Sequence, residues 1–394
     1  MKELLPTAAS FLISEDCNLA CKYCFELIRR NKKHMSSEVA VDAVNYLYEN
    51  AIKNLKYQNN EEVGITLFGG EPFLKPDIID DVVNAALKAR KETGINFNVG
   101  AITNGTILND DIINQYKRYN DLGVDFSIQL SVDSIKELND ENRVTKAGKG
   151  TFDIIEKNIE GFKEIFGGSN FHETNKRNFL HVHGSLNNVT IHKMYESYLF
   201  FRDVWKIPAI WFMPIVGSFW KDEDADTYYQ QLKLISDEIK SKLIETNDLK
   251  WLDDYAPLNR ALDEKPIGMG TPCGAGKNYC TITASGEIYV CHQFYFHKDY
   301  NSAKLGTIYE GIDDERARLL KEYGVSDMYC VIDKDCDAYN CYRCIAENWD
   351  QTGSILSTLY NSRCMMSRHE KNLIEDMRNF INEAKNGNIC HPRN

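Results

Sequence analysis

The segment AASFLISEDCNLACKYC, residues 8–24, is an apolar run that leads directly into three closely spaced cysteines. Residues 8–15 predict a short strand, and Cys17, Cys21 and Cys24 follow it in the spacing Cys-x3-Cys-x2-Cys. Three thiolates on one tight loop can bind three irons of a 4Fe–4S cluster and leave the fourth iron open to a substrate. A structural zinc site needs four ligands, and no further Cys or His lies close by in the sequence.

The cysteines of the chain fall into two groups. Of the 12 cysteines in 394 residues, three lie between residues 17 and 24, none between 25 and 272, and nine from 273 onwards. No stretch reaches the roughly 20 apolar residues that span a bilayer, and the start lacks signal-peptide features, so we expect a cytoplasmic protein without a membrane partner. Disulfides do not persist there, so two metal-binding regions are predicted. The net charge of −12 argues against nucleic-acid binding.

Strands and helices alternate beyond the first cysteines. The pattern predicts strands at 63–68, 96–102, 124–132, 179–186 and 208–213, and helices at 37–54, 77–92, 109–120, 150–165 and 192–205. Strands separated by single helices favour parallel β/α units, so the expected fold class is α/β with a partial (β/α)6 TIM barrel. Cys17, Gly69, Asn104 and Ser131 lie near strand ends, where such folds place their reaction face.

The expected organisation has four parts. These are a core at 1–220, a helical connector at 221–265, a small cysteine-rich α+β domain at 266–366, and a C-terminal helix and tail at 367–394. Within the third part, residues 279–291 alternate as a β-hairpin that turns at Ser285-Gly286. Residues 325–364 hold five cysteines with little regular pattern, which suits a region ordered by metal.

The first cysteines and the segments after them resemble the radical S-adenosylmethionine (SAM) superfamily. In that family the open iron binds the amino and carboxylate groups of SAM, and electron transfer yields a 5′-deoxyadenosyl radical. Gly69, Gly70 and Glu71 of the GGEP segment resemble the motif that binds the SAM amino group. The resemblance implies further SAM-binding positions at Tyr23, Asn104, Ser131, Asp133, Arg143 and Ile210.

The later cysteines are similar to a SPASM domain, which carries two auxiliary 4Fe–4S clusters. The resemblance assigns Cys273, Cys280, Cys291 and Cys344 to the first cluster, and Cys330, Cys336, Cys341 and Cys364 to the second. The order Cys330-x5-Cys336-x4-Cys341-x2-Cys344 departs from the family spacing Cys-x2-Cys-x5-Cys-x3-Cys, so the division between the two clusters stays open. Cys390 is left over, and a zinc-ribbon-like site is the alternative.

The SPASM resemblance implies a peptide or protein substrate. Our leading hypothesis is a maturase that forms a cysteine thioether crosslink in a ribosomally made precursor peptide. The first strand begins almost at once, so a separate leader-binding protein is an expected partner, besides a flavodoxin- or ferredoxin-like reductant. The alternatives are an anaerobic sulfatase-maturating, formylglycine-forming enzyme and a non-catalytic iron–sulfur electron-transfer protein.

Two positions bear on this choice. Sulfatase maturases carry an aspartate base after the second SPASM cysteine and a glutamine before GGEP, whereas this chain has His292 and Phe68. Both differences count against sulfatase maturation. His292 is a candidate catalytic base, although a lone histidine is more often structural. His181 and His183 share one strand face, where they line either a cavity or the core.

Overall fold

The chain folds into two compact units. The computed structural model describes residues 5–26, 32–56, 61–167, 179–207, 209–216, 220–262, 273–275, 278–296, 304–313, 315, 344–353 and 362–385. Unit 1 comprises residues 1–131, 139–180 and 273–325, and unit 2 comprises 132–138, 181–272 and 326–394. Neither unit is continuous along the chain. The domain boundaries at 220, 265 and 366 stay predictions.

Unit 1 is built on a mixed sheet. Its parallel strands are β1 (Ala8–Ser14), β2 (Glu62–Gly69), β3 (Asn96–Thr103) and β4 (Asp125–Ser131), which pair in chain order. On the other edge of β1 lie β7 (Tyr279–Ile282), parallel to it, and then the antiparallel strands β8 (Glu287–Tyr289), β9 (Lys304–Thr307) and β10 (Gly311–Ile312). The α/β class and the hairpin at 279–291 are therefore confirmed.

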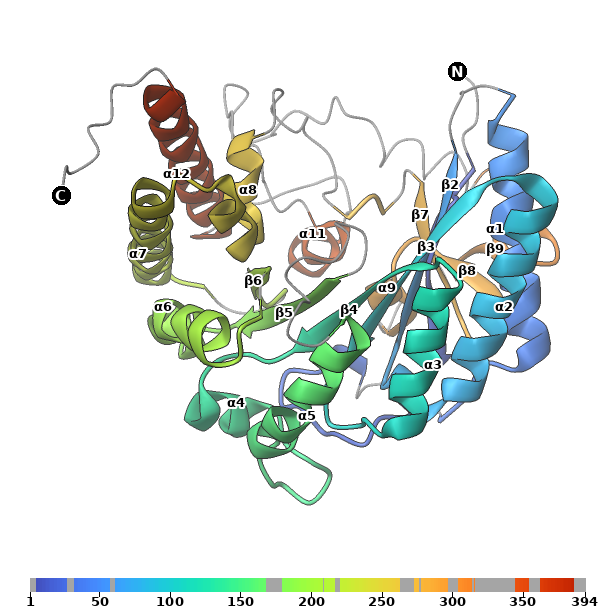
Figure 1. Cartoon of the computed structure of the whole chain (residues 1–394). Helices are drawn as coiled ribbons and strands as arrows, with labels where there is room; N and C mark the ends of the chain where they lie inside the picture. The colour runs from blue at the N-terminus through green and yellow to red at the C-terminus, as the bar shows by residue number, and fades with distance from the viewer. Residues whose placement is uncertain are drawn as a thin grey trace. The chain divides into compact units, whose positions relative to one another are not determined.

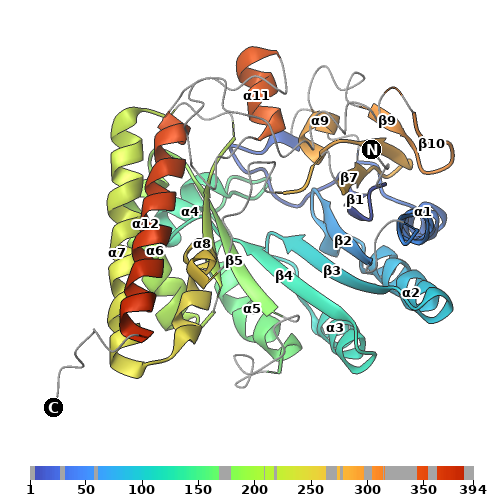
Figure 2. The ribbon, with the colours of Figure 1, turned by 90° about the horizontal axis from the view of Figure 1, so that it is seen from above.

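Four helices cover one face of the sheet; the first three connect its successive parallel strands and the fourth follows β4 (Figures 1 and 2). They are α1 (Ser37–Asn54), α2 (Pro76–Thr93), α3 (Asp110–Asp121) and α5 (Phe152–Ile165). Asn109 caps α3 by accepting a hydrogen bond from the Ile112 backbone N–H at 2.9 Å, and Gly94 ends α2 in the left-handed conformation. The shorter elements are η2 (Pro72–Leu74), α4 (Lys136–Asn142) and α9 (His292–Phe296).

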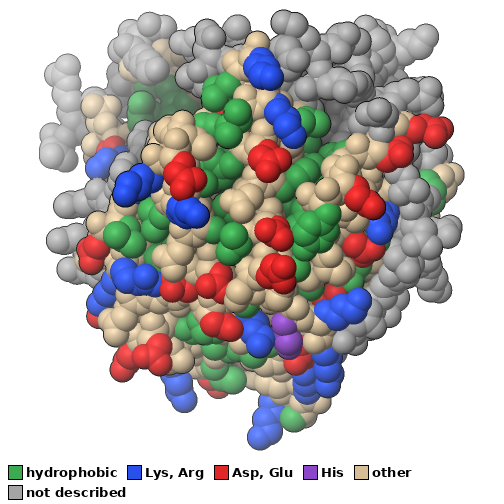
Figure 3. Space-filling model, turned by 90° about the vertical axis from the view of Figure 1, so that its right-hand side faces the viewer, with side chains coloured by type: hydrophobic (Ala, Val, Ile, Leu, Met, Phe, Trp, Pro, Cys, Tyr) green, Lys and Arg blue, Asp and Glu red, His purple; other side chains and the backbone are tan. Residues whose placement is uncertain are grey.

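The surface over α1 and α2 has a mixed character. Figure 3 shows acidic, basic and apolar side chains interspersed on the right-hand side of the molecule, where these helices lie. Lys53–Glu49 and Lys88–Glu92 are exposed i,i+4 ion pairs with N–O separations of 3.9 and 4.0 Å, so each contributes at most about 1 kcal/mol. Among the described residues, no helix is long and apolar enough to cross a bilayer.

Unit 2 contains a parallel strand pair and a pair of long helices. β5 (Phe179–Leu186) pairs with β6 (Ile210–Pro214), and α7 (Asp222–Thr246) packs along α12 (Ser362–Lys385) (Figures 1 and 2). The helix expected at 192–205 is three segments, namely η4 (Thr190–Lys193), α6 (Met194–Leu199) and the π-helix η5 (Phe200–Val204). The other elements are η6 (Leu249–Asp254), α8 (Ala256–Asn259), η7 (Arg260–Leu262) and α11 (Ile345–Thr352).

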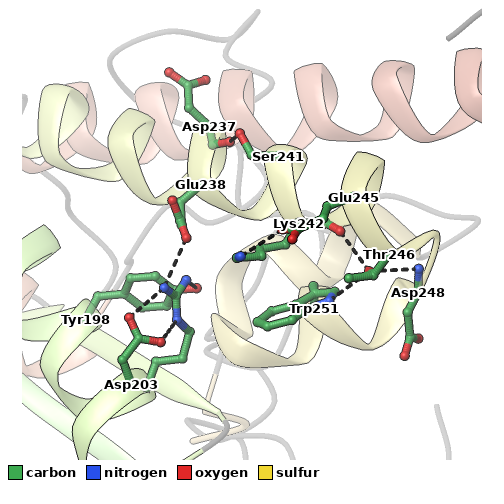
Figure 4. A network of polar contacts seen from close by, with 11 residues as sticks. Tyr198, Asp203, Asp237, Glu238, Ser241, Lys242, Glu245, Thr246, Asp248 and Trp251 are labelled. Carbon is green, nitrogen blue, oxygen red and sulfur yellow. Dashed lines mark hydrogen bonds and ion pairs between the residues drawn. The ribbon is translucent and has the colours of Figure 1, made fainter. Parts of the chain in front are cut away.

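A polar network joins η5, α7 and η6 around the guanidinium of Arg202. This group bonds Asp203 through two nitrogens at 2.7 and 2.8 Å and pairs with Glu238 at 3.0 Å. Figure 4 shows Tyr198, Asp203 and Glu238 on the same side of this network. The guanidinium also lies over the ring of Tyr198 at 5.0 Å and that of Trp251 at 5.9 Å. The Arg202 side chain is only 9% exposed, so these contacts replace the water it loses.

Candidate functional site

The three-cysteine loop leaves β1 and folds back on itself. Cys17 and Cys21 are 5% and 7% exposed, and both pack with buried Leu19 and half-buried Cys24. The Cys24 N–H donates to the Cys21 carbonyl at 3.1 Å, which closes a turn, and the Leu19 N–H donates to Cys17 Sγ at 3.4 Å. The loop therefore packs its three cysteine side chains with Leu19.

The donor set fits an iron–sulfur cluster. Soft thiolates are its usual ligands, and each cysteine binds a different iron, so the three sulfurs need not converge on one point. Within the described residues, no three His, Cys, Asp or Glu side chains are gathered as they would be around a single metal ion. Cys17, Cys21 and Cys24 would hold the cluster, and the cluster would supply one-electron chemistry there.

Gly69 and Gly70 let the end of β2 pass against the cysteine loop. Gly69 has a φ of 127°, and a Cβ on it would collide with the Ser14 carbonyl. A Cβ on Gly70 would lie 2.6 Å from the Asp16 carbonyl carbon and 3.0 Å from the Cys17 nitrogen. The backbone N–H groups of Gly70 and Glu71 donate to the carbonyls of Ser14 and Asp16 at 2.6 and 3.0 Å. Both glycines are thus required by the protein's own backbone contacts.

The carboxylate of Glu71 joins the ends of β2 and β3. It is fully buried and accepts hydrogen bonds from the Phe73 N–H at 3.0 Å, from Thr103 Oγ1 at 2.8 Å and from the Asn104 N–H at 2.8 Å. Burial raises the pKa of Glu71 to about 7, against the lowering effect of these donors and of Arg143. Its pairing with the SAM amino group stays a prediction.

A second set of hydrogen bonds ties the loop after β3 to the cysteine loop. Asn104 donates through Nδ2 to Asn18 Oδ1 at 2.9 Å and to Cys17 Sγ at 3.7 Å. Asn18 Nδ2 donates to Thr106 Oγ1 at 2.7 Å, and the Thr106 N–H donates to Asn104 Oδ1 at 2.9 Å. The sequence identified Asn104, within the segment TNGT that also contains Thr106, but not Asn18. The only sequence signal for Asn18 is that it follows Cys17 directly.

Arg143 and Tyr23 meet, although they lie 120 residues apart. Arg143 NH1 donates to the Tyr23 hydroxyl at 2.6 Å, and Arg143 is only 7% exposed. The backbone beside Arg143 pairs with the cysteine loop, because the Ala20 N–H donates to the Val144 carbonyl at 2.8 Å. The structure thus brings together two residues that the sequence suggested separately.

The later cysteines are distributed over both units. In unit 1, Cys280 of β7 is fully buried opposite Ala9 of β1, and burial raises the pKa of its thiol to about 12. Cys291 follows β8 and is 7% exposed, and Cys273 is exposed. In unit 2, half-buried Cys344 and Cys364 lie at the N-cap of α11 and in α12. Cys330, Cys336, Cys341 and Cys390 lie outside the described residues.

Three predicted SAM-binding positions lie at strand ends. Ser131 ends β4 in unit 1. In unit 2, Asp133 is 1% exposed and accepts a hydrogen bond from the Ser185 N–H at 3.3 Å, and Ile210 begins β6 with no exposed surface. Their part in SAM binding stays a prediction.

His292 stands between two phenylalanine rings in unit 1. Its ring centroid lies 4.5 Å from that of Phe68 and 5.6 Å from that of Phe25, which follows Cys24 directly. Burial lowers the pKa of His292 to about 4. The two positions that depart from the sulfatase-maturase pattern, 68 and 292, are therefore in contact with each other.

The histidines of β5 share one strand face in unit 2. The His183 ring meets that of Trp211 edge-on at 5.8 Å, and burial together with the nearby His183 lowers the pKa of His181 to about 3. Both are half-buried, whereas Val182 and Leu186, which point to the opposite face, have no exposed surface.

Comparison with known proteins identifies the class of this domain. Residues 11–174 match the model of the Radical SAM superfamily, and this segment contains the cysteine loop, GGEP, Asn104 and Arg143. Residues 11–174 are therefore a radical SAM domain. The superfamily implies one 4Fe–4S cluster and SAM at the site built by the cysteine loop.

Particular relatives share parts of the sequence. The chain is 24% identical over 295 residues to the radical SAM cyclopropyl synthase TigE of Paramaledivibacter caminithermalis, covering 72% of this chain and 57% of that protein. It is 30% identical over 148 residues to a cysteine-type anaerobic sulfatase-maturating enzyme of Clostridium novyi, covering 37% of each. The matches thus span about half or less of these curated relatives.

Solved structures share the fold. The structure titled "Native anSMEcpe with bound AdoMet" aligns with a TM-score of 0.70 at 19% identity, covering 96% of this chain and 99% of that one. Streptococcus suis SuiB bound to S-adenosylmethionine aligns with a TM-score of 0.58 at 15% identity, covering 91% of this chain and 77% of that one. The expected α/β radical SAM fold is confirmed.

Proposed function

We propose that this chain is a radical SAM enzyme that modifies a peptide, most simply by forming a cysteine thioether crosslink in a ribosomally made precursor. The observation that carries the proposal is the fixed cysteine loop. Gly70, Glu71 and Asn104 hold it from two neighbouring strand ends, in a domain that matches the superfamily. An electron carrier has no use for such a SAM site.

The residues of the chain have separable tasks in this proposal. Cys17, Cys21 and Cys24 would hold the cluster, which would supply the one-electron chemistry for SAM cleavage. Arg143, oriented by its hydrogen bond to Tyr23 at 2.6 Å, pairs with the SAM carboxylate. Gly69, Ser131, Asp133 and Ile210 complete the set of proposed SAM contacts.

The eight cysteines from Cys273 to Cys364 form the second part of the proposal. We assign them to two auxiliary 4Fe–4S clusters, with the division given by the SPASM resemblance. A bound metal deprotonates a ligating thiol outright, so the high pKa that burial gives to Cys280 is compatible with ligation. Auxiliary clusters held by these cysteines would supply a site for a substrate thiolate or an electron acceptor.

The contact between Phe68 and His292 supports a substrate chemistry different from sulfatase maturation. The sulfatase pattern has glutamine and aspartate at these positions, whereas this chain has an apolar ring tilted against an imidazole, with ring centroids 4.5 Å apart. We propose His292 as the base that receives a proton from the substrate. A His292→Asn variant should keep SAM cleavage and lose crosslinked product.

The bond that forms is a further part of the proposal. The match to a relative named as a cyclopropyl synthase favours a carbon–carbon bond as the second candidate. Either crosslink removes a pair of hydrogens from the peptide. Thiol labelling of the product distinguishes them, because a thioether consumes a cysteine thiol and a carbon–carbon bond leaves it free.

We propose a precursor peptide as the partner of this enzyme, with a separate leader-binding protein and a flavodoxin- or ferredoxin-like reductant. The structures of SuiB with precursor peptide SuiA and of anSMEcpe with Cp18Cys peptide support a peptide substrate on this fold. We place the reaction in the cytoplasm, where free thiols remain available as cluster ligands.

The decisive experiment measures SAM cleavage. Anaerobically reconstituted protein with SAM and dithionite should release 5′-deoxyadenosine, and Cys17→Ala, Cys21→Ala and Cys24→Ala should each abolish it. Cys390→Ala, at the cysteine left over by the assignment, is the matched control. Variants of the cysteines from Cys273 onwards should retain cleavage and lose product with a short cysteine-rich peptide encoded beside this chain. Well-formed clusters without cleavage contradict the proposal.

A further inference from the structure

The side chain of Asn104 has only one orientation that satisfies its hydrogen bonds. Its Oδ1 faces the Thr106 backbone N–H at 2.9 Å, and a backbone N–H can only donate. The atom there must therefore be the carboxamide oxygen, since an NH2 group would place two donors against each other. The NH2 group then points to the opposite side, toward Asn18 Oδ1 at 2.9 Å and Cys17 Sγ at 3.7 Å.

The surrounding residues hold this orientation. Asn18 accepts from Asn104, so its own NH2 group donates to Thr106 Oγ1 at 2.7 Å, and this hydroxyl in turn donates to Asn104 Oδ1 at 2.5 Å. The three side chains form a closed set in which every described hydrogen bond has a donor and an acceptor. Asn104 is 5% exposed, so water competes little for its amide.

We propose that Asn104 tunes the reduction potential of the cluster by donating a hydrogen bond to Cys17 Sγ. The proposal rests on the proposed cluster at Cys17, Cys21 and Cys24. A thiolate ligand becomes more negative when the cluster gains an electron, so an N–H donor at its sulfur stabilises the reduced form more than the oxidised form. Asn104 thereby raises the potential and eases the reduction that precedes SAM cleavage.

This role differs from direct SAM binding. The NH2 and carbonyl groups of Asn104 are already engaged by Cys17, Asn18 and Thr106, and the backbone N–H of Asn104 donates to Glu71. Asn104 acts through Cys17, so it is a positioning residue. The Leu19 N–H at 3.4 Å supplies a second donor to the same sulfur and remains in any Asn104 variant.

The structure offers a matched control in a residue that bonds the same loop from a neighbouring helix. Asn158 of α5 donates through Nδ2 to the Gly105 carbonyl at 2.9 Å, and none of its described hydrogen bonds reaches a cysteine sulfur. Asn158→Ala removes one hydrogen bond from the loop that carries Asn104. Any effect that comes only from loosening this loop should therefore appear in both Asn104→Ala and Asn158→Ala.

The test is a redox titration of the reconstituted full chain, followed by electron paramagnetic resonance. Only the signal that changes on SAM addition is scored, because SAM binds the cluster with the open iron. Asn104→Ala should shift its midpoint potential to more negative values at unchanged iron content, and Asn158→Ala should leave it at the wild-type value. Asn104→Asp, which nearly keeps the side-chain shape, should shift it in the same direction and serves if Asn104→Ala loses iron.

Equal potentials in wild type and both Asn104 variants would overturn the role of Asn104 and leave the enzyme proposal intact. A shift of equal size in Asn158→Ala would also overturn it, because the loop alone would then explain the effect. A wild-type protein without any SAM-responsive signal would overturn the proposed cluster itself, and the inference with it.

Discussion

Replacing Gly70 by alanine should disrupt the cysteine loop without touching a cysteine. The new Cβ would lie 2.6 Å from the Asp16 carbonyl carbon. Two carbons without a bond between them need about 3.5 Å, so one backbone must move by roughly 0.9 Å. Cys17 follows Asp16 directly, and metal–ligand distances tolerate only about 0.2 Å. The displacement therefore exceeds what the cluster can absorb.

The same displacement has an energetic cost that does not depend on the cluster. Overpacking in a filled interior costs about 1–3 kcal/mol. Moving Asp16 also weakens the hydrogen bond from the Glu71 N–H to the Asp16 carbonyl, which is 3.0 Å long in the wild type. Loss of this bond costs about 1 kcal/mol. We therefore expect Gly70→Ala to lose about 2–4 kcal/mol of unfolding free energy.

Three measurements on Gly70→Ala check this reasoning, namely urea unfolding, iron content after reconstitution, and 5′-deoxyadenosine release. The control is Gly100→Ala in β3, where a Cβ would meet only the Ser127 hydroxyl at 3.3 Å. We expect the control to bind iron and cleave SAM like the wild type. A Gly70→Ala protein with wild-type iron content and cleavage would refute the argument that this contact positions the cluster.

Three further predictions concern buried charges. Burial raises the pKa of Asp254 to about 7 from 3.8, so its neutral form stabilises the fold at low pH and this contribution is lost as the pH rises from about 4 through about 7. Relative to wild type, the free energy of unfolding of Asp254→Asn in urea should therefore increase by up to about 2–4 kcal/mol on going from pH 4 to pH 8. The same difference between variant and wild type at both pH values would contradict the raised pKa. Arg202→Met should cost about 1–3 kcal/mol in the same assay, because it removes the charged hydrogen bonds of a guanidinium that is 9% exposed. Arg118→Met, at a side chain that is 46% exposed, should cost under about 1 kcal/mol, and equal losses would show that the burial of Arg202 is irrelevant. Glu71→Gln should cost about 1–3 kcal/mol and lower the iron content, because its NH2 group faces a donor at the Asn104 or Phe73 backbone; unchanged unfolding and iron content would contradict this.

Local patterns predicted many of the helices and strands closely. The helix at 37–54 and the strand at 179–186 have the predicted bounds, β3 differs from prediction by one residue at one end, and β4 differs by one residue at each end. Side-chain periodicity is a local property, so it could be read directly. The prediction of one regular helix at 192–205 was wrong, because apolar periodicity does not distinguish the π-helix at Phe200–Val204 from an α-helix.

The pairing of β7 with β1 was not predictable from the sequence. Cys280 lies opposite Ala9, and Tyr279 opposite Ala8, across a separation of more than 260 residues. The hairpin at 279–291 could be inferred from its alternating side chains and the Ser285-Gly286 turn. No local pattern, however, tells which distant strand will pair with the edge of this hairpin. This pairing matters for the site, because it belongs to the same unit in which the His292 ring contacts the Phe68 ring.

The sequence by itself predicted the chemistry of this protein through the spacing of Cys17, Cys21 and Cys24, since three thiols within eight residues are close enough to bind one cluster. Only the tertiary structure decided how that loop is held. The collision that excludes a side chain at Gly70 and the single allowed orientation of Asn104 depend on atoms from different strands. Such contacts arise from packing, which spacing along a chain does not encode.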